Sequence, residues 1–135
     1  MSFKDLREFL ALLEKENQLL RITESVMPEP DLSAIGRAVL SLENGPAVIV
    51  ENIKGYKNSV ALNVHGSWQN HALMLGLPKD TSIKDQFFAL DKKWSAYPIK
   101  PVWVTEAPVK EVKITTDINL FDVLSLFRVN KFDGG

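Results

Sequence analysis

The run Ala47-Val48-Ile49-Val50, directly after Pro46, constrains the fold more than any other stretch of the sequence. Four apolar residues are too few for a helix, and three of them are β-branched, which is typical of strands. We therefore predict a buried strand over 47–50, and with it a fold that contains a sheet as well as helices.

Apolar residues at helical spacing predict helices on both sides of this strand. Ser2 is the candidate N-cap of the first helix, because Asp5 stands three residues on, as in a short capping box. Gly36 interrupts the second helix at a cost of about 1 kcal/mol relative to alanine, so we expect it to allow close packing. Ser67 is the expected N-cap of the third. The predicted helices are 2–17, 32 to about 44, 68–75, and one capped by Thr81 or Ser82 that extends to Trp94.

Further strands are predicted where β-branched and apolar residues cluster between turn signals. Pro98 and Pro101 forbid a continuous helix after residue 96, and Asp117 is the candidate cap of a last turn through 120–124. The predicted strands are 19–22, 60–64, and a pair formed by 102–105 and 112–114. The class is α+β, with a small mixed sheet and several packing helices.

Length and composition predict a single domain over residues 1–135. The net charge is −1, with 16 basic and 17 acidic residues and no long run of either sign, which argues against nucleic-acid and membrane partners. The sequence holds no Cys, which removes disulfides and thiolate sites. With no cleavable apolar leader at the N-terminus, we expect a cytoplasmic location.

No catalytic constellation is visible in the residues. His65 and His71 lack the spacing of a zinc helix, and the turn from Asn63 to Ser67 lacks a phosphate-binding motif. We therefore predict no catalytic, cofactor-binding or metal-binding residues in this chain. A small-ligand site that uses Asn63, His65 and Asn70 is a weaker hypothesis.

Several segments, in the right order and spread over the whole chain, resemble the UbiD-type decarboxylases, which use prenylated flavin mononucleotide. Two further segments, Gly66–Ala72 and Leu75–Pro78, are similar to the subgroup that decarboxylates hydroxybenzoates such as 4-hydroxybenzoate and vanillate. The segments that carry the family resemblance are Asp5–Leu10, Gln18–Ile22, Gly45–Val48, Glu51–Tyr56, Asp117–Leu124, Leu126–Arg128 and Asp133–Gly135.

The resemblance implies that this chain is an N-terminal domain or a truncated form. The final Phe132-Asp133-Gly134-Gly135 suggests an interrupted chain, and residues from about 117 to 135 would lead into a split-barrel domain. In the family that domain holds prenylated flavin, a divalent metal such as manganese, and potassium. The catalytic Glu-Arg-Glu set also lies beyond this point. The implied partners are the catalytic domain, other copies in a homo-oligomer, and a flavin prenyltransferase that supplies the cofactor.

Two functions therefore remain open. The chain is either the catalytically silent domain of a hydroxybenzoate decarboxylase, or a stand-alone interaction module that dimerises or binds a partner. The second predicts an exposed apolar patch at Phe121, Leu124, Phe127 and Phe132.

Overall fold

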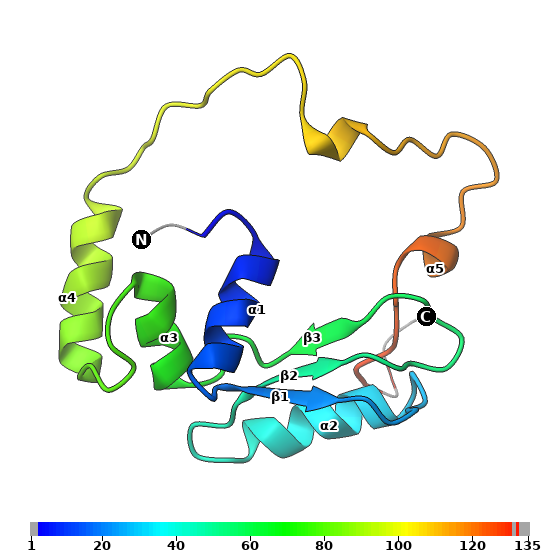
Figure 1. Ribbon diagram of the computed structural model, residues 1–135, viewed down its shortest axis with the longest axis horizontal. Helices are drawn as coiled ribbons and strands as arrows, with labels where there is room; N and C mark the ends of the chain where they lie inside the picture. The colour runs from blue at the N-terminus through cyan, green and yellow to red at the C-terminus, as the bar shows by residue number, and fades with distance from the viewer. Residues whose placement is uncertain (1–2, 131, 133–135) are drawn as a thin grey trace.

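A three-stranded mixed sheet forms the centre of the protein, as the computed structural model in Figure 1 shows. The model describes residues 3–130 and 132. Strand β1 (Leu19–Ile22) pairs in parallel with β2 (Ala47–Val50), with Leu19 opposite Ala47. Strand β3 (Val60–Leu62) pairs antiparallel with the other edge of β2, with Val48 opposite Leu62. The predicted central strand and the small mixed sheet are confirmed.

Helices cover the two faces of the sheet (Figure 1). Helix α2 (Asp31–Leu40) packs on one face, where Leu32 and Val39 join Val48 and Val50 in a buried cluster. On the other face, α1 (Leu6–Lys15) and α3 (Trp68–Leu75) enclose Ala47. Helix α4 (Ile83–Trp94) lies against α3. Strand β2 is covered from both sides, as its uninterrupted apolar sequence requires.

Local capping chemistry sets the helix boundaries. Ser67 and Ser82 cap α3 and α4 through bonds from the Asn70 and Asp85 amides, which confirms Ser67 and selects Ser82 over Thr81. Helix α1 instead begins after Asp5, whose carboxylate accepts from the Glu8 amide. The prediction of a helix from residue 2 is therefore wrong at its start, and Ser2 itself lies outside the described residues.

Two elements end earlier than predicted, and an asparagine adopts a left-handed conformation at or soon after each end. Helix α2 ends at Leu40, and Asn44 turns the chain with a φ of 54°. Strand β3 ends at Leu62, since Asn63 has a φ of 51°. Asparagine tolerates this region better than most residues.

Residues 95–119 form a long excursion away from the core, which we call the strap (Figure 1). Its only regular element is a 3-10 turn at Pro108–Lys110. The predicted strand pair at 102–105 and 112–114 is wrong: in the described part of the chain, neither segment is paired with a strand that would satisfy its backbone groups. Trp103 is 94% exposed.

The chain returns to the core through α5 (Leu120–Val123). Asn119 caps this turn by accepting from the Phe121 amide, while Asp117 precedes it with a φ of 48°. Asp117 is therefore not the cap that the sequence suggested. Among the described residues, no helix has the length and apolar character that crossing a membrane requires.

Candidate functional site

The two histidines contact different aromatic side chains. The His65 ring stacks on Phe9 with 5.7 Å between ring centroids. The His71 ring meets Trp68 edge-on at 5.8 Å, and its Nδ1 is buried without a hydrogen-bond partner. Within the described part of the chain, no three His, Asp or Glu side chains gather closely enough to hold a metal ion.

The polar residues around the turn that follows β3 stabilise the fold itself. The Asn63 amide donates to the Gly45 and Pro46 carbonyls, both at 3.0 Å. The Asn70 amide donates to the Val64 carbonyl at 3.1 Å. The side-chain amide groups of Asn63 and Asn70 are therefore engaged inside the domain, while a ligand site that uses Asn63, His65 and Asn70 stays a hypothesis.

The segment 123–128 after α5 is fastened to the core by contacts with residues far away in the sequence. The Tyr56 hydroxyl donates to the Leu126 carbonyl at 2.7 Å. The Asn58 amide donates to the Val123 carbonyl at 2.8 Å, and the Ser125 hydroxyl donates back to the Asn58 carbonyl. We call residues 123–128 the anchor segment.

A charged pair and one aromatic side chain complete this attachment. Arg128 donates to Glu29 through its backbone amide and its guanidinium, at 2.8 and 3.0 Å. The guanidinium bond, supported by the amide bond, holds the pKa of the Glu29 carboxyl below its usual value. Phe127 packs against the cluster beneath α2. The anchor segment is therefore part of the domain's packing.

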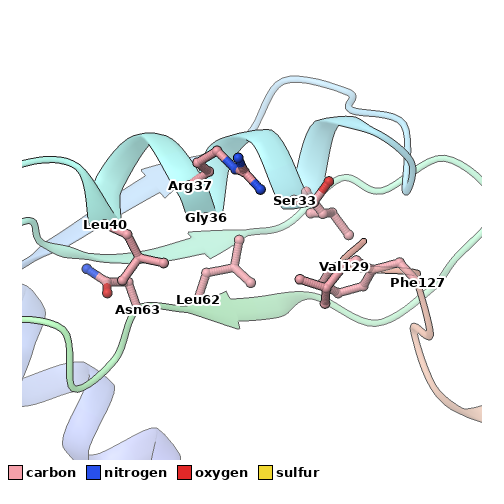
Figure 2. A pocket seen from close by; sticks show the side chains of 9 residues that line it. Ser33, Gly36, Arg37, Leu40, Leu62, Asn63, Phe127 and Val129 are labelled. Carbon is pink, nitrogen blue, oxygen red and sulfur yellow. The ribbon is translucent and has the colours of Figure 1, made fainter. Parts of the chain in front are cut away.

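A groove lies between α2, the end of β3 and the anchor segment (Figure 2). It encloses about 580 Å³. We call it the α2 groove. Its walls are mostly aliphatic, with the Arg37 guanidinium lying along α2 toward Ser33 (Figure 2). The residues that line it are Leu32, Ser33, Gly36, Arg37, Leu40, Leu62, Asn63, Phe127 and Val129.

The sequence interpretation missed this groove. Its only local signal is Gly36, a helix-breaking residue on an apolar helix, which we expected to allow close packing. That expectation is wrong for the described residues: a Cβ added at Gly36 would meet nothing within 4 Å. The remaining walls come together only through contacts between distant parts of the chain.

Three of the four residues of the predicted apolar patch have exposed side chains. Phe121 is 58% exposed, Leu124 48% and Phe132 87%. Phe127 differs because it packs against the cluster beneath α2.

The groove does not fit a metal-bound flavin phosphate. Manganese and magnesium prefer carboxylate, carbonyl and water oxygens, whereas the lining residues of the groove include no Asp or Glu and are mostly apolar, with one guanidinium. That these groups are held elsewhere in the family remains a prediction.

Comparison with known proteins shows which family the chain belongs to. Residues 10–90 match the model of the 3-octaprenyl-4-hydroxybenzoate carboxy-lyase N-terminal domain. The phenolic acid decarboxylase of Sedimentibacter hydroxybenzoicus is 59% identical over 136 residues, covering 98% of this chain and 28% of that protein. The enzyme of the same name from Bacillus subtilis is 53% identical, covering 100% and 29%.

Solved structures agree in fold. The vanillic acid decarboxylase of S. hydroxybenzoicus in its closed form matches with a TM-score of 0.92 and 58% identity, over 100% of this chain and 29% of that one. The UbiD-class enzyme HmfF from Pelotomaculum thermopropionicum, in complex with FMN, matches with a TM-score of 0.65 and 26% identity, over 93% and 27%. The chain thus spans less than a third of its relatives, and it belongs to the UbiD family through that family's N-terminal domain.

Proposed function

We propose that this chain is the N-terminal domain, or a truncated form, of a non-oxidative decarboxylase of the 4-hydroxybenzoate and vanillate type. The identity of 59% to a phenolic acid decarboxylase over nearly the whole chain carries this proposal. Its role there is structural: it packs against the cofactor domain and helps to shape the large subunit. We place it in the cytoplasm.

The exposed apolar side chains of the strap support a packing role. A soluble domain rarely leaves many large apolar residues open to water on one segment. In the complete enzyme another domain would cover them. The strongly exposed examples are Ile99, Val102, Trp103, Val109 and Val112.

We propose further that the isolated chain is catalytically silent. In the complete enzyme, prenylated flavin with manganese and potassium would supply the electron sink for loss of the carboxylate. A flavin prenyltransferase would provide that cofactor, and the enzyme would assemble as a homo-oligomer. The described residues do not fit the metal-bound phosphate, so no step is assigned to them.

The test is release of carbon dioxide from 4-hydroxybenzoate or vanillate. The purified chain is supplied with prenylated flavin, manganese and potassium, and the complete phenolic acid decarboxylase of S. hydroxybenzoicus serves as the positive control. We expect no release above the protein-free rate. Turnover by the chain alone would overturn the claim of silence.

A second candidate is an interaction module that dimerises or binds a partner through the surface that a catalytic domain would cover. The exposure of Phe121, Leu124 and Phe132 favours it. Sedimentation of the purified chain distinguishes the two. A strict monomer at micromolar to millimolar concentration argues against dimerisation, and a dimer supports the interaction module.

A further inference from the structure

Unfilled space beside Gly36 of α2, within the α2 groove, is the first observation that points to a ligand. Gly36 lies in the middle of α2, and even an added Cβ would find no atom within 4 Å. Leu32 and Leu62 are among the apolar lining residues, and Phe127 lies at one end of the groove (Figure 2). Pockets of roughly 300–1,000 Å³ with apolar walls and few polar groups are typical of small-molecule sites, and 580 Å³ falls in that range.

An arginine without an acidic partner is the second observation. Of the four arginines in the sequence, Arg7, Arg21 and Arg128 each pair with a carboxylate within 4 Å. Arg37 has no such partner among the described residues, and it borders the α2 groove. Guanidinium groups bind carboxylates through two parallel hydrogen bonds. Arg37 is therefore available to bind an anionic ligand in the groove.

The remaining polar groups of the groove limit the kind of ligand that fits. The Asn63 amide is engaged by the Gly45 and Pro46 carbonyls. The Ser33 hydroxyl donates to the Pro30 carbonyl at 2.8 Å, so its oxygen can only accept a further bond. A ligand that fits has one anionic end and an apolar body, and an aromatic ring in that body would pack against Phe127, which lines the groove.

We propose that the α2 groove binds a small aromatic monocarboxylate. The carboxylate pairs with Arg37, and the ring lies over Gly36 between Leu62 and Phe127. The guanidinium is exposed, so water competes for it, and we expect dissociation constants on the order of 0.1–1 mM. This site is separate from the proposed function: the test of decarboxylation does not depend on its outcome.

The test follows backbone amide resonances of the ¹⁵N-labelled chain during titration with 4-hydroxybenzoate. We expect saturable shifts at Ser33, Gly36, Leu62 and Phe127. Acetate provides the charge without the ring, and 4-hydroxybenzyl alcohol provides the ring without the charge. Each should shift these amides at least tenfold more weakly at equal concentration.

Two variants with a matched control distinguish this site from general surface binding. Gly36→Leu places a side chain in the open space, and Arg37→Gln removes the charge. Both should weaken binding at least tenfold, while Arg7→Gln on α1 should leave it unchanged. Resonances away from the groove report whether each variant is folded.

Three results would overturn the proposal. The first is the absence of shifts at 10 mM acid in the wild-type chain. The second is binding of 4-hydroxybenzyl alcohol as tight as that of 4-hydroxybenzoate, which would show that the groove does not recognise the carboxylate. The third is a dependence of the same amides on protein concentration without ligand, which would show that a second copy covers the groove.

Discussion

Replacement by alanine should change the stability of the domain in opposite directions at Gly36 and at Gly45. Gly36 lies inside α2, and a Cβ there would meet nothing within 4 Å. Alanine is better than glycine in a helix interior by about 0.8–1 kcal/mol, partly because it restricts the unfolded chain. We expect Gly36→Ala to stabilise the domain by about 0.5–1 kcal/mol.

Gly45 is the matched opposite. It is buried, and an added Cβ would stand 2.0 Å from the Val39 carbonyl oxygen and 3.0 Å from the carbonyl carbon. Both atoms belong to the backbone of α2, so relief requires movement of the helix end or of the turn before β2. Overpacking of this kind costs about 1–3 kcal/mol.

Thermal unfolding followed by circular dichroism measures both effects. An unfolding entropy of about 2.1 cal/mol/K per residue gives roughly 0.28 kcal/mol/K for a chain of this length. Gly36→Ala should then raise Tm by roughly 2–4 °C, and Gly45→Ala should lower it by roughly 4–11 °C. A lower Tm for Gly36→Ala would refute the reasoning, because it would mean that another group packs closely against α2 at position 36.

Three further outcomes follow from single contacts. Ser67→Ala removes the cap of α3 and should cost about 1 kcal/mol in urea unfolding, while Ser67→Thr keeps most of it. Asn63→Gly preserves the left-handed turn but leaves the Gly45 and Pro46 carbonyls without their donor, so it should cost about 1–3 kcal/mol; an unchanged midpoint would contradict this. The pKa of Glu29 is lowered in the folded state, so its contribution to stability is complete above its usual pKa and is lost as pH falls through the lowered value. Glu29→Gln should therefore be less stable than wild type at pH 7 and match it at about pH 2; an equal difference at both pH values would contradict the pairing with Arg128.

Signals confined to a few neighbouring residues were sufficient to predict the centre of the fold. Strand β2 follows from four apolar residues after Pro46, and α3 from Ser67 and the glycine that ends it. The N-cap of α1 was misplaced by three residues, from Asp5 to Ser2, because two overlapping capping patterns are present there. The pattern of Asp5 with Glu8 is the one that forms: Asp5 accepts from the Glu8 amide, and the Glu8 carboxylate accepts from the Lys4 amide.

The groove could not be predicted, because its walls depend on contacts between distant residues. Tyr56 bonds the Leu126 carbonyl across 70 positions, and Glu29 meets Arg128 across 99. Without these bonds Phe127 would not lie beside α2, and the groove would lose one end. Arg37 is also ambiguous in the sequence, since a charged residue on an exposed helix position is usually solvated. Its lack of an acidic partner is visible only in three dimensions.

The strand pair predicted in the strap was wrong for a different reason. Residues 102–105 and 112–114 have the composition of strands, yet strand propensity expresses packing against neighbouring strands more than a preference of the backbone. Among the described residues no strand pairs with either segment, and the side chains of Val102, Trp103 and Val112 remain exposed. The strap connects α4 at one end to α5 and the anchor segment at the other. Its strand-like sequence is consistent with the proposed role of packing against another domain, which the exposed apolar side chains also support.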